Sequence, residues 1–327
     1  MDAETFLREW YNDKPYVVVH TSGSTGIPKS IQLGKDLMAR SARRTISFFD
    51  IQKGDRLHLP LSVDYIAGKM MLVRGEVAGA EVTIEEPSNH VLANYGIGSA
   101  RCSRPIKLIS LVPSQIPDML ERIDEVPEIR NILVGGAAIP VSTLEMLVRS
   151  GIPSYESYGM TETASHVAIR RITEDPDQPF EMLEGISCFM TAKGTLGIKE
   201  GTMVVETNDV AEILSETQFI FKGRKDNIIN SGGIKLYPEE IERKLAPIME
   251  STLGADYYIT SRKSIKWGEE AVLVVEVPEV TDQTECCLKS IKAQMADLFD
   301  GRHKPKDILV LDSFQRTSSG KVKRIKF

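Results

Sequence analysis

Several features that would assign this sequence to a specialised class of protein are missing. Its four cysteines, Cys102, Cys188, Cys286 and Cys287, form no Cys-x-x-Cys pair and no spacing with histidine that is typical of zinc sites. We interpret them as small buried residues of a protein in a reducing compartment. No apolar run approaches the roughly 20 residues of a membrane span, and the acidic N-terminus "MDAETFLREW" is unlike a signal peptide. The sequence therefore predicts a cytoplasmic protein without membrane insertion.

A concentration of basic charge is also missing. The 327 residues have a formal net charge of −6, and lysine and arginine are scattered along the chain. This distribution argues against a nucleic-acid-binding surface and leaves room for a small anionic ligand. The hydrophobic and charged fractions, 42% and 26%, are those of an ordinary globular protein. Because a single core stops growing at about 250 to 300 residues, the length predicts two domains.

Short β-branched runs alternate with helix-length amphipathic stretches up to about residue 220, which is typical of an α/β fold. Helices are predicted at Lys35–Phe49 and Val141–Ser150, the second ended by Gly151 as a C-cap. The predicted strands are Tyr16–His20, Ser30–Leu33, Glu81–Ile84, Ile106–Val112 and Asn131–Val134. This order predicts a mostly parallel sheet covered by helices.

The pattern changes near Asp226. A compact unit of helix, strands, helix and strand follows, and it ends in a tail rich in glycine and lysine. Its first helix has Pro238 in the first turn, followed by Glu239 and Glu240, whose charges favour a helix N-terminus. We therefore predict one domain over residues 1–225 and a second over residues 226–327.

The stretch "HTSGSTGIPKS", residues 20–30, has the composition of an anion-binding loop. It is not a P-loop, because Pro28 stands where the second glycine is required, and no G-x-G-x-x-G fingerprint is present. A strand is predicted on each side, so no helix dipole is available. Hydroxyl groups, backbone N–H groups beside glycine and the charge of Lys29 could nevertheless hold a triphosphate. Taken alone, the loop fits a glycine-rich hairpin turn equally well.

Further segments stand in an order that gives this loop a context. With "TSGSTGIPK", the sequence resembles the adenylate-forming superfamily of acyl-CoA synthetases, luciferases and peptide-synthetase adenylation domains. The matching segments are "TSGSTGIPK", "GGAAIP", "YESYGMTET", "VETNDVAEI", "GRKDNIINSGGIKLYPEEIE" and "RTSSGKVKR". Ordered matches over nearly the whole chain from His20 onward make the resemblance specific.

The resemblance implies a fold and a reaction. The fold is a large N-terminal α/β domain with a helix-covered sheet, followed by a small, mobile α+β domain. In the reaction, a carboxylate attacks the α-phosphate of ATP, pyrophosphate leaves, and the thiol of coenzyme A then attacks the acyl-adenylate. The implied cofactors and co-substrates are ATP, Mg²⁺ and coenzyme A.

The resemblance also implies a nucleotide site. Glu162 would hold Mg²⁺, Thr161 would reach the α-phosphate, Tyr158 would stack on adenine, and Asp209 would accept hydrogen bonds from both ribose hydroxyls. Arg224 would contact the ribose or a phosphate. The other residues implied to contact the nucleotide or coenzyme A are Thr21, Ser22, Gly23, Ser24, Thr25, Gly26, Lys29, Gly135, Gly136, Ala137, Gly159, Met160, Ser231, Gly232 and Gly233.

The catalytic set implied by the resemblance is Lys321 with Glu162, Thr161 and Lys29, and Asp226 matches the hinge. The long side chain of Lys321 would neutralise charge as the carboxylate and the α-phosphate approach. Each assignment has a plainer alternative. Glu162 alone fits a solvated turn, Tyr158 a core position, "SGG" a hairpin turn, and "KVKRIKF" a solvated basic tail.

The acyl substrate is the least specified part of the site. "SYGMTETASHVAIR" and "DYIAGKMMLVR" resemble a short bacterial o-succinylbenzoate-CoA ligase of menaquinone synthesis. Such a substrate carries a second carboxylate, so its pocket needs a cation or strong donors. The candidates are Lys69, Arg74 and His166, with Gly68 on the same segment. A lysine or arginine on a helix is more often solvated, and His166 fits a hydrogen-bonded structural role.

The chain departs from the superfamily pattern at three places. Asn208 replaces a usual glycine, Gln315 replaces a frequent proline, and only 20 residues precede Thr21, where relatives carry a long subdomain. The last departure affects the wall of the acyl pocket, which a homo-oligomer could supply.

Three alternative functions stay open: a ligase for another aromatic or short-chain acid, an adenylation domain that loads a carrier protein, and a nucleotide-binding protein without catalysis.

Overall fold

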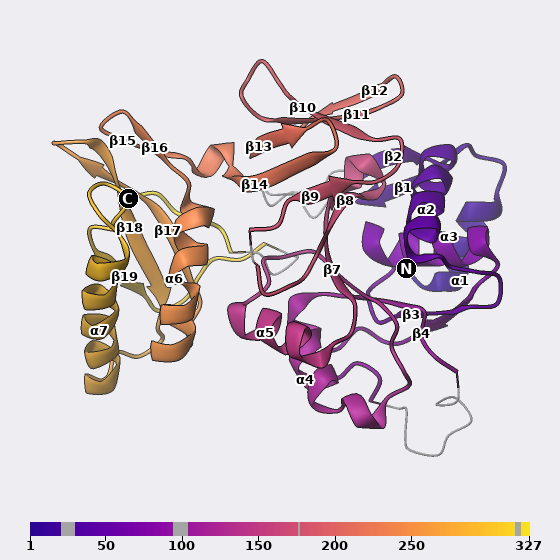
Figure 1. Ribbon diagram of the computed structural model, residues 1–327, viewed down its shortest axis with the longest axis horizontal. Coiled ribbons are helices and arrows are strands. Elements are labelled where there is room, and N and C mark those ends of the chain that lie inside the picture. Colours follow the sequence, from indigo (N-terminus) through magenta and orange to yellow (C-terminus); the bar gives the residue numbers. More distant parts are fainter. Residues whose placement is uncertain (21–29, 94–103, 176, 318–321) are drawn as a thin grey trace. The chain divides into compact units, whose positions relative to one another are not determined.

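The computed structural model describes residues 1–20, 30–93, 104–175, 177–317 and 322–327 (Figure 1). By their contacts these residues divide into two compact units, which are described separately. The first comprises Met1–Cys188, Ile198–Val205 and Leu214–Phe219, and the second comprises Phe189–Gly197, Glu206–Ile213 and Ile220–Phe327. The domain boundary predicted near Asp226 stays a prediction.

A nine-stranded sheet is the framework of the chain. Its strands are β3 (Arg56–Leu59), β4 (Glu81–Ile84), β5 (Leu108–Leu111), β6 (Ile132–Val134), β7 (Ser154–Met160), β8 (Ser165–Arg171), β9 (Phe180–Met182), β13 (Asp209–Ser215) and β14 (Gln218–Arg224). Strands β4, β3, β5, β6 and β7 pair in parallel in that order. Strands β7, β8, β9 and β14 pair antiparallel. The predicted parallel sheet is therefore confirmed for one half only.

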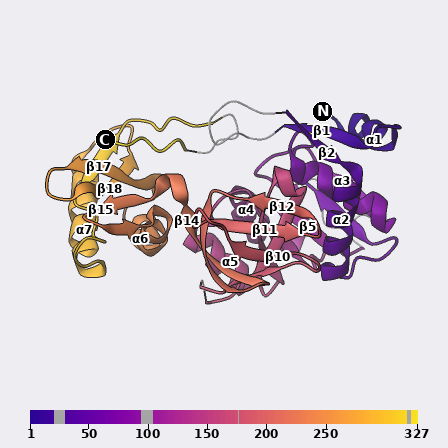
Figure 2. The same cartoon turned by 90° about the horizontal axis from the view of Figure 1, so that it is seen from above.

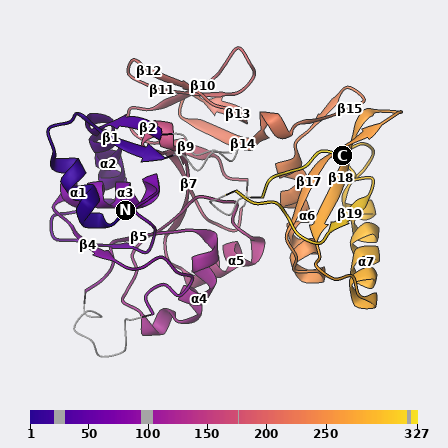
Figure 3. The same ribbon diagram turned by 180° about the vertical axis from the view of Figure 1, so that it is seen from behind.

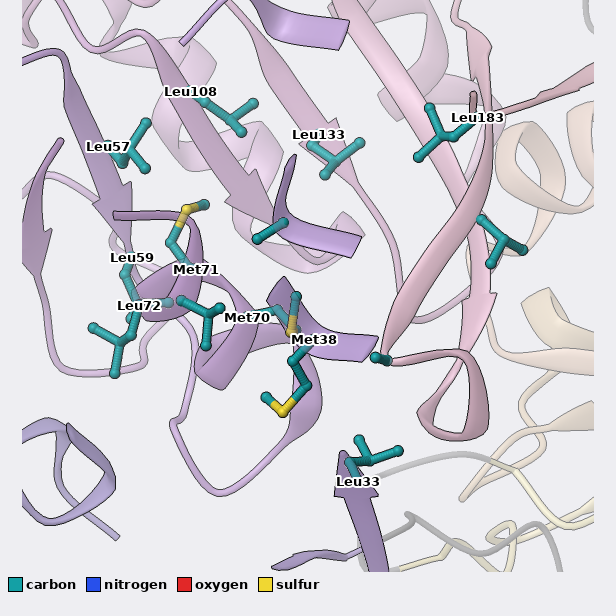
Figure 4. Packing of buried hydrophobic residues seen from close by; sticks show 14 of the residues in the cluster. Leu33, Met38, Leu57, Leu59, Met70, Met71, Leu72, Leu108, Leu133 and Leu183 are labelled. Atoms are coloured by element: carbon teal, nitrogen blue, oxygen red, sulfur yellow. The ribbon is translucent and has the colours of Figure 1, made fainter. Parts of the chain in front are cut away.

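Helices cover both faces of the parallel half. Helices α2 (Lys35–Phe49) and α3 (Ile66–Ala78) pack on one face, and α4 (Ile116–Glu121) and α5 (Val141–Ser150) pack on the other (Figure 3). The side chains of strand β6 explain why both faces of the sheet are covered. Leu133 joins the first hydrophobic cluster (Figure 4), whereas Ile132 and Val134 join the second, because side chains alternate across a strand.

A helix and a hairpin complete the N-terminal part of the first unit (Figure 2). Helix α1 (Ala3–Tyr11) begins after Asp2, whose side chain accepts from the Thr5 N–H at 2.7 Å. Strands β1 (Tyr16–His20) and β2 (Ser30–Gly34) pair antiparallel, with His20 opposite Ser30. The side chains of Phe6, Val17, Val19 and Leu33 are buried in the same hydrophobic cluster as those of α2 and α3.

A separate three-stranded sheet consists of β10 (Ser187–Met190), β11 (Leu196–Glu200) and β12 (Met203–Glu206).

The C-terminal part of the second unit has its own sheet and core. Its strands are β15 (Ile229–Ser231), β16 (Ile234–Leu236), β17 (Tyr257–Ser264), β18 (Gly268–Glu276) and β19 (Ile308–Leu311). Helices α6 (Pro238–Thr252) and α7 (Asp282–Leu298) pack together on one face, against Leu273 and Val275 of β18. Val274 points to the other face, where it meets Tyr258 and Phe314. Helix α6 begins at Pro238, as the sequence predicts.

Within the described residues, no helix combines the length and the hydrophobicity needed to cross a membrane.

Candidate active site

Two parts of the predicted site lie outside the described residues. They are the phosphate-loop residues Thr21, Ser22, Gly23, Ser24, Thr25, Gly26 and Lys29, and the catalytic candidate Lys321. The flanks of both segments are described. The loop joins the paired strands β1 and β2, so a strand on each side is confirmed. Arg316 and Val322 form a β-bridge on either side of the lysine segment.

The "YESYGMTET" motif lies where β7 leaves the sheet. Its first residues form β7, and Thr161–Thr163 form the 3-10 turn η4. Thr163 holds this turn, because its hydroxyl accepts from the Met160 N–H at 3.1 Å. Glu162 is exposed, and no described side chain binds its carboxylate. The Glu162 carboxylate is therefore available to a ligand.

The "GGAAIP" turn lies beside this motif. It follows β6, which is parallel to β7, so both segments leave the sheet at the carboxyl ends of neighbouring strands, where α/β proteins bind ligands. A Cβ atom on Gly135 would stand 2.6 Å from Ser157 Oγ, and Gly136 has a φ of +91°. Ala137 follows in the same turn. The structure therefore brings these two predicted parts of the nucleotide site together.

Tyr158 contacts an aromatic cluster. Its ring centroid lies 5.0 Å from that of Phe219 and 5.9 Å from that of Phe180, and the side chain is half-buried. At Gly159 the pairing of β7 with β8 shifts register in a β-bulge. Stacking of Tyr158 on adenine stays a prediction, because its ring is also part of the core.

The predicted ribose residues lie together in the second unit. Asp209 is buried, and its Oδ1 lies 3.4 Å from Nη1 of Arg224. The Asp226 carboxylate accepts from the side-chain amide of Asn208, and the Lys225 N–H donates to the Asn208 carbonyl at 2.8 Å. Asn208, which stands where the superfamily usually has glycine, thus links the ribose segment to the predicted hinge residue.

The "SGG" segment is a tight hairpin. Ser231 pairs with Ile234, and Gly232 and Gly233 have φ values of +55° and +84°, which glycine adopts readily. A Cβ atom on Gly232 would lie 2.6 Å from the ring of Trp267. The Arg302 guanidinium stacks 4.3 Å from the centre of this ring and donates to the Gly232 carbonyl at 2.6 Å. Sequence reasoning did not predict Trp267 and Arg302.

Lys69 lies on α3, the segment predicted to contact the acyl substrate. Its side chain is buried, and its ammonium donates to the Val63 carbonyl at 2.5 Å and lies 5.6 Å from the Phe6 ring centre. Burial lowers the pKa of Lys69. A Cβ atom on the neighbouring Gly68 would stand 2.3 Å from the Ser62 carbonyl oxygen. A solvated position for Lys69 is therefore excluded.

Arg74, five residues further along α3, is only 1% exposed. Its Nη2 donates to Ser165 Oγ at 3.2 Å and lies 3.4 Å from His166 Nδ1. Its Nε is buried without a hydrogen-bond partner, and no described carboxylate lies close enough to affect its charge. Burial lowers the pKa of Arg74 to about 10, so the guanidinium stays charged at neutral pH. An uncompensated buried charge is costly, which makes this position suited to an anionic ligand.

His166 is buried beside Arg74. Its Nε2 lies 3.1 Å from Oγ1 of Thr45 on α2. Burial and the charge of Arg74 lower the pKa of His166 well below 6.5. Sequence reasoning identified Arg74 and His166 but missed Ser165 and Thr45. A signal for Thr45 was present, because it lies four residues after Ser41 on the otherwise apolar inner face of α2.

Comparisons with known proteins agree with this arrangement. A model of the AMP-binding enzyme family matches residues 5–223. A 2-succinylbenzoate–CoA ligase of Listeria monocytogenes is 26% identical over 99% of this chain and 72% of its own length. An AMP-forming acyl-CoA synthetase-like protein of Dyadobacter fermentans is 31% identical over 98% of this chain and 91% of its own, with a TM-score of 0.62.

A solved structure with lower sequence identity to this chain has the same fold. O-succinylbenzoate CoA synthetase of Bacillus subtilis, solved with its acyl-adenylate, is 23% identical with a TM-score of 0.78, covering 94% of this chain and 67% of that one. Since the family model spans most of the chain and its matched range contains the motifs on β6, β7 and β13, the chain belongs to the AMP-binding enzyme family.

Proposed function

We propose that this protein is an AMP-forming acid-thiol ligase that converts 2-succinylbenzoate to its coenzyme A thioester. The observation that carries the choice of substrate is Arg74, a buried cation without a carboxylate partner among the described residues. A substrate with two carboxylates can present one to the α-phosphate of ATP and the other to this guanidinium. Relatives that share most of the chain's length, such as the enzyme from Listeria monocytogenes, are named for this substrate.

In the first step the substrate carboxylate attacks the α-phosphate and pyrophosphate leaves. Asp209 accepts hydrogen bonds from the ribose hydroxyls, and the neighbouring Arg224 contacts the ribose or a phosphate. Thr161 reaches the α-phosphate from the η4 turn. Lys29 and Lys321 supply the positive charges that reduce repulsion between the carboxylate and the phosphates.

Glu162 is the residue that would hold Mg²⁺. Its carboxylate is exposed and has no bonding partner among the described side chains, which fits an ion that takes one or two protein carboxylates plus phosphate oxygens. The described residues contain no group of three metal-binding side chains, so a purely protein-made cage is absent from them. When bound, the metal ion offsets phosphate charge.

In the second step the thiol of coenzyme A attacks the acyl carbonyl and AMP leaves. We propose that residues 226–327 reorient about Asp226 between the steps, and that residues 1–225 hold the acyl-adenylate throughout. The Ser231–Gly233 hairpin then lies along the path of the pantetheine arm, with space at Gly233, where a Cβ atom would meet nothing within 4 Å.

The proposal is tested by coenzyme A-dependent AMP release across a panel of acids. We expect 2-succinylbenzoate to be preferred strongly over benzoate, indoleacetate and fatty acids. Equal rates on benzoate and fatty acids would contradict the substrate assignment. Product on a phosphopantetheinylated carrier protein but not on free coenzyme A would favour a carrier-loading domain, and ATP binding without carboxylate-dependent pyrophosphate exchange would favour a protein without catalysis.

A further inference from the structure

The hydrogen bonds around His166 define where its proton lies. Arginine has only N–H donors, so Nδ1 of His166, 3.4 Å from Arg74 Nη2, must be the acceptor of this contact. The single ring proton of a neutral imidazole is then on Nε2, which donates to Thr45 Oγ1 at 3.1 Å. The Thr45 hydroxyl in turn donates to the Ser41 carbonyl at 3.2 Å. The Ser165 hydroxyl, which accepts from Arg74, lies 3.3 Å from the same Nδ1 and can donate to it, so both contacts assign Nδ1 as an acceptor.

This chain of hydrogen bonds is anchored in the main chain. The Ser41 hydroxyl donates to the Ala164 carbonyl at 3.0 Å, so α2 is tied to the turn that precedes His166. Ala164 and Ser165 have positive φ values of +52° and +104°, which are uncommon for residues other than glycine. Such backbone conformations persist where the surrounding structure enforces them, and they are concentrated at functional sites. The turn therefore holds Ser165 Oγ and His166 Nδ1 at fixed positions against Arg74.

We propose that His166 is a positioning residue for Arg74: it accepts one guanidinium N–H and so directs the remaining donors toward the carboxylate of the substrate that does not react. The inference rests on the proposed function. It differs from direct substrate binding by His166, because both ring nitrogens are already engaged with Arg74 and Thr45. It also accounts for a neutral histidine in contact with a buried arginine, since a second positive charge there would repel the guanidinium.

The first test reads the tautomer directly. In the full-length protein labelled with ¹⁵N-histidine, long-range ¹H–¹⁵N correlation spectra should show His166 as a neutral imidazole protonated on Nε2 at pH 7. The signal is assigned by its loss in His166→Asn. An imidazolium, or a proton on Nδ1, would overturn the inference whether or not the protein acts on 2-succinylbenzoate.

The second test separates the two ring nitrogens by substitution. Asn places an amide oxygen near the position of Nδ1, whereas Gln places its amide near Nε2. We expect His166→Asn to keep KM for 2-succinylbenzoate within about 3-fold, and His166→Gln to raise it about 10-fold or more, as for loss of a hydrogen bond to a charged group. KM for ATP should not change in either variant. The reverse order of the two variants would overturn the inference.

Substrate analogues show whether the effect acts through Arg74. Either 4-oxo-4-phenylbutanoate or 2-butanoylbenzoate, each lacking one carboxylate of 2-succinylbenzoate, retains the carboxylate that reacts. We expect His166→Gln to leave kcat/KM for that analogue nearly unchanged while lowering it for 2-succinylbenzoate. Equal losses on both would mean that His166 has only a structural role.

The matched control is His58→Gln, which alters another buried histidine on the same sheet. His58 Nε2 lies 2.9 Å from Glu85, and the substitution should lower stability without changing the preference for 2-succinylbenzoate over the analogue. A wild-type protein that releases no AMP with any of these acids would contradict the proposed function. The tautomer measurement would still decide whether His166 is the acceptor of the Arg74 hydrogen bond.

Discussion

Burial of Arg74 places a full positive charge among apolar side chains, with Ser165 and His166 as its hydrogen-bond partners in the described structure. The sequence identified Arg74 from its segment, but it could not show that the side chain is buried. A helix that is apolar on most sides gives no periodic signal for which face its few charged residues occupy. Burial distinguishes Arg74 from the solvated arginines that the same pattern would allow.

Replacing Arg74 by methionine should separate activity from stability. Loss of one partner of a buried charge pair costs about 2 to 5 kcal/mol, so we expect kcat/KM for 2-succinylbenzoate to fall about 30- to 4000-fold. The free energy of unfolding should stay equal or rise, because an apolar side chain needs no counter-charge. Steady-state kinetics and urea denaturation measure the two effects. Unchanged kinetics would show that the substrate does not contact Arg74.

His166 should make the protein less stable in mild acid. Its pKa is lowered well below 6.5 by burial and by Arg74, so below that pH the unfolded chain binds a proton that the folded protein does not. Stability from this residue is therefore present above its unfolded pKa and is lost as pH falls. The loss grows as pH falls below about 6.5, by at most about 1.36 kcal/mol per pH unit while the folded protein keeps His166 neutral.

Urea denaturation of the wild type and His166→Asn between pH 7.5 and 5 measures this contribution. The wild type should lose more stability than the variant over this range. Parallel curves would show that His166 is protonated equally in the folded and unfolded states.

At the scale of elements, the parallel strands and their helices were predictable, and the antiparallel strands were less so. Strands β5 and β6 are buried on both faces and are apolar apart from Ser110, which gives a strong signal. Strands β8 to β14 follow hairpin connections and mix polar with apolar residues, so their pairing direction depends on turns such as η4. The register shift between Tyr158 and Gly159, opposite the β8 residues that contact Arg74, left no distinct pattern in the sequence.

The substitution Gly159→Ala tests the structural role of that turn. A Cβ atom there would stand 2.2 Å from the Ser165 carbonyl oxygen and 2.4 Å from His166 Cα, so Gly159→Ala must displace the main chain of β8. We expect a loss of about 1 to 3 kcal/mol in the free energy of unfolding, together with a higher KM for 2-succinylbenzoate.

The matched control is Gly34→Ala. Gly34 has a φ of −61°, and a Cβ atom would meet nothing within 4 Å. This variant should be close to neutral, because the gain of about 0.4 to 1 kcal/mol from a less flexible unfolded chain is opposed by the poorer N-cap that alanine gives α2. Equal effects of the two substitutions would contradict a specific role for the bulge.

At the scale of the whole molecule, the order of motifs along the chain carried the prediction of the family, and the family model confirms it. It stays a prediction that residues 1–225 hold the acyl-adenylate and that residues 226–327 reorient, because this concerns one state of the protein for each of the two steps. The segment with Lys321 belongs to only one of these states in our proposal, so the two half-reactions should respond differently to its loss.

Lys321→Ala should abolish adenylate formation and spare thioester formation from a preformed acyl-adenylate. The lysine neutralises charge only while the carboxylate approaches the α-phosphate. Carboxylate-dependent exchange of pyrophosphate into ATP reports the first step, and thioester formation from synthetic acyl-adenylate reports the second. Equal loss of both would indicate that Lys321 is needed for the structure or for both states.

The most direct measurement of the central claim combines the purified protein with 2-succinylbenzoate, ATP, Mg²⁺ and coenzyme A, and identifies the products by mass spectrometry. The proposed function predicts the 2-succinylbenzoyl thioester of coenzyme A, with one AMP and one pyrophosphate formed for each thioester. Release of ADP in place of AMP, or no thioester from a folded preparation that binds ATP, would contradict it.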